Sequence, residues 1–104
     1  MIVEERDYRV KTGKLAEFVS LYEKHGLPIQ LELLGTFLGY FTTEFGELNH
    51  VVALWGYESL DDRQQRRDQM MADPRWQEYL KITQGLLEEQ HSRILRPTSF
   101  SPIK

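Results

Sequence analysis

The first third of the chain changes from the pattern of a β-strand to that of a helix. Residues 2–10 mix β-branched, aromatic and charged side chains and end at a Lys-Thr-Gly-Lys turn, which is typical of a strand. Apolar side chains recur at helical spacing over residues 15–22, and we expect Gly26 to end this helix because glycine tolerates a left-handed C-terminal position. Pro28 suits the first turn of a second short helix, which is predicted to end at Gly35.

Residues 36–57 carry the pattern of a β-hairpin. The first arm covers residues 36–44, a Phe-Gly-Glu turn follows, and the second arm covers residues 48–57. The second arm is rich in valine, leucine and aromatic residues, which favours a strand with at least one buried face. We therefore expect its side chains to alternate between the two faces of a sheet.

The remaining sequence predicts two helices and a final strand. Ser59 and Asp62 resemble a capping box at the start of a strongly charged helix. Asp73 followed by Pro74 predicts the start of a further helix, and residues 88–96 carry the pattern of a strand. The expected inward side chains of the two helices are Leu60, Arg67, Met70, Met71, Trp76, Tyr79, Leu80 and Thr83.

The order strand, helix, strand, strand, helix, strand is that of the split βαβ, or ferredoxin-like, α+β fold. We expect one domain over residues 1–104, with a four-stranded antiparallel sheet, helices on one face and a surface tail at about residues 98–104. The uncovered face of such a sheet measures roughly 400 Å² and would be half apolar, which is near the limit for a soluble monomer. The chain is therefore predicted to form a homodimer through this face.

Composition narrows the class of protein. The chain has 104 residues, a formal net charge of −3 and no cysteine. The charge balance, without a basic patch, argues against nucleic acid as a partner, and the lack of cysteine excludes disulfides, thiol catalysis and cysteine-ligated zinc. The acidic N-terminus lacks the pattern of a signal peptide, and no apolar stretch reaches the ~20 residues of a membrane span. We expect a cytoplasmic protein.

Four segments of the chain resemble the NIPSNAP family, namely MIVEERDYRVKTGKL, LNHVVALWGYESL, ADPRWQEYL and RILRPTSFSP. They follow one another in order over essentially the whole chain. The resemblance implies a dimeric α/β barrel related to antibiotic-biosynthesis monooxygenase-like domains, in agreement with the ferredoxin-like order of elements. It implies no particular reaction, because the family has no settled enzymatic activity.

One face of the predicted sheet gathers polar and aromatic side chains. The candidate ligand-binding residues are Glu4, Arg6, Tyr8, Asn49, Trp55 and Tyr57. Alternation puts the first three on one face of the first strand and the last three on one face of the third strand, which is its neighbour in this topology. The same alternation turns His50 to the opposite face. Two interpretations remain open: an aromatic ligand pocket between sheet and helices, or a buried Glu4–Arg6 ion pair with Trp55 as ordinary core.

Three functions compete on this basis. The convergence of Arg6, Tyr8 and Trp55 favours a small organic molecule bound in the cleft, with or without cofactor-independent monooxygenase-like chemistry. Haem binding, which the resemblance to this fold also raises, is disfavoured because the helix DPRWQEYLK has no histidine. A non-enzymatic interaction module would use the charged helix, with Arg66 and Arg67 as contacts. We predict no cofactor and no metal site, since no histidines are spaced as metal ligands, and assign no catalytic residue.

Overall fold

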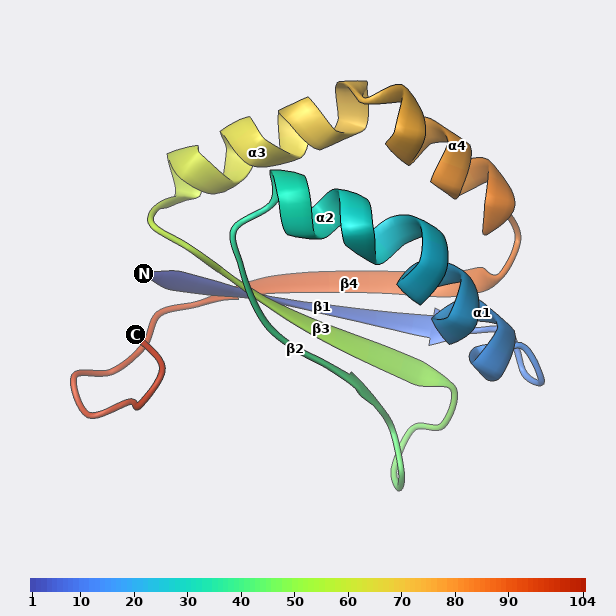
Figure 1. Cartoon of the computed structure of the whole chain (residues 1–104). Helices are drawn as coiled ribbons and strands as arrows, with labels where there is room; N and C mark the ends of the chain where they lie inside the picture. The colour runs from blue at the N-terminus through green and yellow to red at the C-terminus, as the bar shows by residue number, and fades with distance from the viewer.

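The chain folds into a sheet and a layer of helices that lies above it (Figure 1). The computed structural model describes residues 1–104. Its helices and strands are β1 (Ile2–Val10), α1 (Leu15–Leu21), α2 (Leu27–Leu33), β2 (Thr36–Thr42), β3 (His50–Tyr57), α3 (Leu60–Ala72), α4 (Pro74–Ile82) and β4 (Leu87–Leu95). The strands pair antiparallel in the order β2-β3-β1-β4. The predicted ferredoxin-like α+β fold is therefore confirmed.

The first helical segment continues through Gly26 instead of ending there. A π-helical turn, η1 (Tyr22–Gly26), joins α1 to α2, and Gly26 keeps right-handed dihedral angles of φ −97° and ψ −50°. The prediction that Gly26 ends a helix was therefore wrong. The glycine serves close packing instead, because a Cβ atom at this position would lie 2.8 Å from the ring of Tyr79.

The strands of the hairpin are shorter than their sequence pattern predicts. β2 ends at Thr42 and β3 begins at His50, so Asn49 precedes the strand. Asn49 takes a left-handed backbone conformation with a φ of 65°, which asparagine tolerates better than most residues. Its carbonyl oxygen accepts a hydrogen bond of 2.8 Å from the amide of Val10. Asn49 therefore closes one end of the sheet and does not continue the alternation of β3.

The register of the sheet brings the predicted polar and aromatic residues together. β1 lies between β3 and β4, and β1 pairs with β3 so that Glu4 is opposite Trp55 and Arg6 is opposite Ala53. The side chains of these residues lie on the face that the helices cover, where Trp55 is only 1% exposed. The two strands that the order of elements predicts to be neighbours are therefore hydrogen-bonded along their length.

The two C-terminal helices begin at side-chain caps. The Oγ of Ser59 accepts a hydrogen bond of 3.0 Å from the amide of Asp62, and the Oδ1 of Asp73 accepts one of 2.8 Å from the amide of Arg75. Both starts agree with the prediction. No helix combines the length and the apolar character that crossing a membrane requires.

Half of the eight inward residues predicted for these helices are buried, namely Met70, Trp76, Tyr79 and Thr83. Leu60 is 58% exposed, and its prediction as a buried contact was wrong. It is the first residue of α3, where the chain has just left the sheet. Met71 and Leu80 are 50% and 43% exposed, and both line a cavity between the layers.

The second face of the sheet carries no helix (Figure 1). His50 lies on this face, as alternation predicts, and is only 7% exposed. Its Nδ1 atom is 2.6 Å from Oδ1 of Asp7, and Arg93 donates to Glu5 at 2.7 Å on the same face. Apolar side chains accompany these polar pairs, and Phe41 of β2 is 54% exposed. The uncovered face is therefore a mixture of ion pairs and apolar side chains.

Candidate functional site

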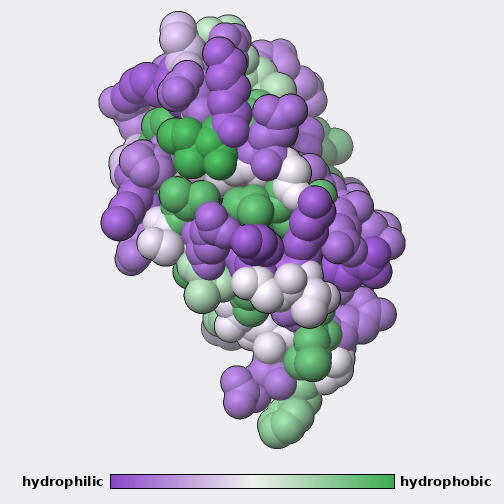
Figure 2. All heavy atoms as spheres, turned by 90° about the vertical axis from the view of Figure 1, so that its right-hand side faces the viewer, coloured by the Kyte–Doolittle hydropathy of each residue, from purple (hydrophilic) through white to green (hydrophobic).

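A cavity of about 290 Å³ lies between the sheet and the helices. Ala53 and Trp55 of β3 line it from the sheet, and Trp76 and Tyr79 of α4 line it from the helical layer. Its volume is close to the lower end, about 300 Å³, of the range for small-molecule sites. Figure 2 shows the end of the molecule at which α4 finishes, and apolar side chains gather in its middle, framed by hydrophilic ones. Eleven of the 16 residues that line the cavity are hydrophobic, several of them aromatic, so the cavity is mostly apolar and aromatic.

Paired aromatic rings form much of the cavity wall. The rings of Tyr22 and Tyr40 stack with centroids 4.6 Å apart, and those of Trp76 and Tyr79 lie 4.7 Å apart. The hydroxyl of Tyr22 donates a hydrogen bond of 2.5 Å to Oε1 of Gln30. Burial raises the pKa values of Tyr22, Tyr40 and Tyr79, so these phenols are neutral at physiological pH.

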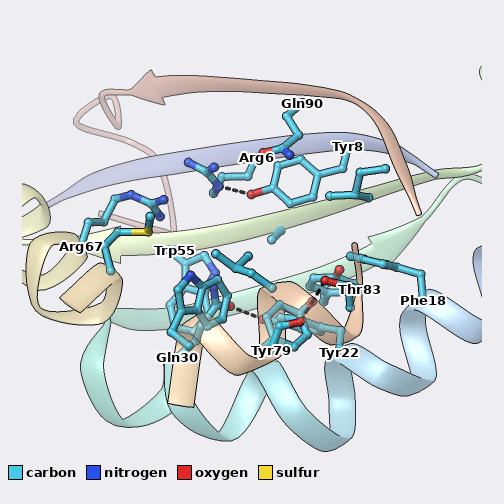
Figure 3. A pocket seen from close by; sticks show the side chains of 16 residues that line it. Arg6, Tyr8, Phe18, Tyr22, Gln30, Trp55, Arg67, Tyr79, Thr83 and Gln90 are labelled. Carbon is cyan, nitrogen blue, oxygen red and sulfur yellow. Dashed lines mark hydrogen bonds between the residues drawn. The ribbon is translucent and has the colours of Figure 1, made fainter. Parts of the chain in front are cut away.

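The polar groups of the cavity gather around Arg6 and Tyr8 of β1 (Figure 3). The Nε of Arg6 donates a hydrogen bond of 2.5 Å to the hydroxyl of Tyr8, and its Nη1 donates one of 2.9 Å to Oε2 of Glu4. These two bonds fix the plane of the guanidinium group. Because the Tyr8 oxygen accepts from Arg6, its own hydroxyl hydrogen remains available to a ligand.

The carboxylate of Glu4 holds the guanidinium group of Arg6 in place. This fully buried carboxylate accepts hydrogen bonds from Arg6, Arg63 and Ser92. Burial alone would raise its pKa, but the hydrogen bonds from Arg63 and Ser92, with the charges of Arg6 and Arg63, outweigh burial and lower the pKa to about 2. Glu4 is therefore ionised and fully engaged, which suits it to positioning Arg6 and not to accepting a proton.

Arg67 reaches the same end of the cavity from α3 (Figure 3). It is half-buried, and its guanidinium group has no hydrogen-bond acceptor or carboxylate partner within the chain. Burial lowers the pKa of Arg67, and the nearby charge of Arg6 lowers it further. The neighbouring Arg66 donates instead to Asp62 and to the carbonyl of Leu34. The two arginines predicted to form one partner surface therefore have different surroundings, and Arg67 faces the cavity.

The structure distributes the six candidate residues over different surroundings. The candidates that line the cavity are Arg6, Tyr8 and Trp55. Glu4 lies behind Arg6 and contacts the cavity only through it. Asn49 lies at the end of the sheet and is not a lining residue, because its left-handed backbone takes it out of the alternation of β3. Arg6 therefore fits both the ligand-pocket and the ion-pair interpretation, because it belongs to a buried ion pair and also faces a cavity.

Tyr57 belongs to a separate hollow at the start of α3. It lines this hollow together with Leu34, Gly56 and Arg66. The ring is 2% exposed, and its buried hydroxyl has no hydrogen-bond partner. Burial, together with the negative charge of Glu4, raises the pKa of Tyr57 to about 12. Tyr57 therefore does not contribute directly to the aromatic cavity.

The candidate site residues named from the sequence include none from the helices or from β2. Trp76 and Tyr79 were expected to point inward, but Tyr22, Tyr40 and Gln30 were not among the candidate site residues. Helical spacing predicts which side of a helix is buried, but not which face of the sheet it meets or how closely. The one available signal was the number of aromatic residues at inward positions.

The side chains that line the cavity are suited to holding a ligand. The structure contains no group of three or more His, Cys, Asp or Glu side chains able to hold a metal ion. The lining of the cavity includes no histidine, which is a common ligand of haem iron. It does include a guanidinium group without a partner, phenol hydroxyls and a large aromatic surface. These groups can hold a mostly apolar molecule by its polar end.

Comparison with known proteins gives the affiliation of the chain. The sequence model described as NIPSNAP matches residues 3–102. Over 97% of its length the chain is 35% identical to Protein NipSnap of Drosophila melanogaster, and over 99% it is 36% identical to Protein NipSnap homolog 3B of Mus musculus. It spans 36% and 42% of the lengths of these two relatives.

Solved structures agree with this affiliation. A nipsnap family protein with unknown function from Agrobacterium tumefaciens matches with a TM-score of 0.97 and 40% identity, over 100% of this chain and 94% of that one. A putative antibiotic biosynthesis monooxygenase from Nitrosomonas europaea matches with a TM-score of 0.69 and 13% identity, over 93% of this chain and 98% of that one. At this identity the second match shows a shared fold alone.

Proposed function

Because the chain belongs to the NIPSNAP family, whose related structure from Agrobacterium tumefaciens is described as having unknown function, we propose that it binds a small organic molecule in the cavity between its sheet and its helices. The observation that carries this proposal is an aromatic cavity of about 290 Å³ with its polar groups gathered around Arg6. Protein interiors leave few spaces larger than a water molecule, so a space of this size and character favours an occupant.

The groups around the cavity favour binding over proton transfer. Glu4, with a pKa of about 2, is held by its donors and has no free oxygen for a substrate proton. His50 lies on the other face of the sheet, bound to Asp7. The alternative of a cofactor-independent monooxygenase-like enzyme would need a substrate that ionises without a protein base. Oxygen consumption by the protein with quinol substrates tests this alternative, and its absence would count against it.

Thermal unfolding in the presence of ligands tests the binding proposal. We expect at least one class among quinols, aromatic acids and fatty acyl compounds to raise the Tm, because a ligand at 100 times its Kd stabilises a fold by about 2.7 kcal/mol. Ala53→Leu places three further carbon atoms on the cavity floor and should abolish the response. Ala16→Leu makes the same change at an exposed position of α1 and should leave it intact.

The outcome of this experiment separates binding from unspecific stabilisation. Loss of the response in Ala53→Leu alone would locate the ligand in the cavity. An equal response of Ala53→Leu and wild type would place binding elsewhere and overturn the proposal. A wild-type protein that no compound class stabilises would also count against it.

The partner and location of the chain belong to the same proposal. A homodimer formed through the uncovered face of the sheet is supported by the apolar side chains of that face, such as Phe41, which is 54% exposed. A cytoplasmic location is compatible with a chain that has no cysteine. Both stay predictions.

A further inference from the structure

The arginines of the chain differ in whether an acidic side chain neutralises them. Those that form ion pairs are Arg6, Arg9, Arg63, Arg66, Arg75 and Arg93. The two that form none are Arg67 and Arg96. Arg96 follows β4 and is exposed, so water solvates its charge. Arg67 is half-buried against the cavity, where solvation by water is incomplete.

The end of the cavity at Arg67 has an excess of positive charge. Figure 3 shows Arg6 and Arg67 directed toward the same region from opposite layers of the molecule. The one carboxylate of this cluster, Glu4, is shared between Arg6 and Arg63, so it does not neutralise a third guanidinium group. The chain as a whole has a net charge of −3, so this excess is local. Two like charges without a counter-ion between them are unfavourable, and a bound anion would relieve that repulsion.

We infer that the ligand of this cavity is an organic monoanion, with its charged group bound by Arg67 and its apolar body placed among the aromatic rings. This inference rests on the proposed function and adds the chemical class of the ligand. A carboxylate is the simplest group that fits, because the planar guanidinium fork matches its two oxygens. Arg6 and Arg63 already donate to Glu4, so only the fork of Arg67 is free, and one fork suits the two oxygens of a carboxylate better than the three of a phosphate.

The surroundings of Arg67 also offer donors and space of the right kind. The hydroxyl of Tyr8 keeps its hydrogen for a ligand because its oxygen accepts from Arg6. The amide side chain of Gln90, the residue paired with Tyr8 in the sheet, also lines the cavity (Figure 3). The volume of about 290 Å³ corresponds to roughly ten water molecules, so the ligand has on the order of ten or more non-hydrogen atoms. A single aromatic ring with a short acidic chain meets these conditions.

Pairs of acids and their neutral amides test the charge requirement directly. The probes are 4-phenylbutanoate with 4-phenylbutanamide, and octanoate with octanamide, at pH 7. Both tryptophans of the chain, Trp55 and Trp76, line the cavity, so intrinsic fluorescence reports its occupation. We expect each acid to bind at least tenfold more tightly than its amide, as a hydrogen-bonded charge pair provides.

Three variants assign this preference to Arg67. Arg67→Gln removes the charge while retaining hydrogen-bond donors, and we expect the acid and the amide to bind it equally. Arg67→Lys restores a positive charge and should restore part of the preference. Arg66→Gln is the matched control, because Arg66 is the next residue along α3 and its guanidinium group is engaged by Asp62 and Leu34. It should keep the full preference.

The results distinguish failure of this inference from failure of the proposed function. Equal binding of acids and amides to the wild type would overturn the anionic ligand and leave a cavity that binds neutral molecules. A preference that survives in Arg67→Gln would overturn the role of Arg67. Absence of any fluorescence or thermal response to acids and amides alike would count against the proposed function and the anionic ligand together.

Discussion

Glu4 is buried without losing its charge, and the free energy of unfolding of the domain is therefore expected to decrease at acidic pH. Its pKa is lowered from the ordinary glutamate value of 4.5 to about 2 in the fold. A carboxylate with a lowered pKa stabilises the fold fully above its unfolded value, and that stabilisation, about 3 kcal/mol, is lost as the pH falls from about 4.5 to about 2. We expect Glu4→Gln to lower the free energy of unfolding by about 3 kcal/mol at pH 7 but very little at pH 2, as measured by urea denaturation.

Glu17 of α1 provides the control for this prediction. It lies on the helical side and pairs with Lys14, and both side chains are 53% exposed. Exposed ion pairs contribute little to stability, so Glu17→Gln should follow the wild-type pH profile. Parallel profiles for wild type and Glu4→Gln between pH 7 and pH 2 would show that the buried network does not depend on the charge of Glu4.

The candidate site was predictable where residues obey the alternation of a regular strand. Arg6, Tyr8 and Trp55 line the cavity because β1 and β3 keep a period of two through these positions. Asn49 departs from the pattern because one residue with a φ of 65° changes the direction of the chain. Arg67 was expected to point inward, yet its lack of a partner follows from the positions of Glu4 and the neighbouring arginines, which only the folded structure brings together.

At the scale of elements, Gly26 decides how closely α4 approaches the first helical segment. Replacing glycine by alanine within a helix normally stabilises it by about 0.5–1 kcal/mol. Here the added Cβ would lie 2.8 Å from the ring of Tyr79 and 2.9 Å from that of Tyr22, and overpacking of this kind costs about 1–3 kcal/mol. We expect Gly26→Ala to lower the free energy of unfolding by about 1–2 kcal/mol in urea denaturation. Ligand affinity should also fall, because both rings line the cavity.

A matched change elsewhere in the same segment isolates this packing effect. Ser20 is exposed in α1, so Ser20→Ala changes helix propensity without touching Tyr79. It should leave stability unchanged or slightly increased. A Gly26→Ala variant that is more stable than the wild type would mean that the rings move aside freely and that glycine is not required there.

Local sequence signals predicted the starts of the helices well where a side chain caps the helix. The caps at Ser59 and Asp73 mark the starts of α3 and α4, because their side chains bond the amides that open a helix. Gly26 predicted the end of a helix equally strongly, but the helical segment continues past it through a π-helical turn. The difference is tertiary, since the packing of Tyr79 on Gly26 requires a residue without a side chain.

For the whole molecule, the order of elements predicted the fold, and the family resemblance is confirmed by the match over residues 3–102. The strand order β2-β3-β1-β4 follows from six elements in sequence, because short connections and antiparallel neighbours leave few other arrangements. The cavity does not follow from topology. Its volume depends on the distance between the helical layer and the sheet, which side chains as far apart in sequence as Tyr22 and Tyr79 determine.

The uncovered sheet face leads to a prediction about the assembly of the whole molecule. Leu54 lies in a central strand of this face, opposite Glu5, and is half-buried in the single chain. A lysine at this position would be solvated beside Glu5 in a monomer but would be placed in the apolar contact of a face-to-face dimer. We therefore expect wild type to sediment as a dimer at micromolar concentration and Leu54→Lys to sediment as a monomer with unchanged circular dichroism.

The same substitution on the helical side shows whether the sheet face is responsible. Leu31 of α2 is 53% exposed, so Leu31→Lys adds an equal charge far from the proposed contact and should leave the dimer intact. Dissociation by both variants would mean that added charge alone separates the subunits. A wild type that sediments as a monomer would mean that the ion pairs of Asp7 and Glu5 are enough to keep this face exposed to water. Dissociation by Leu54→Lys alone leaves one consistent structure, in which two sheets cover each other and each cavity lies on the opposite face of its sheet.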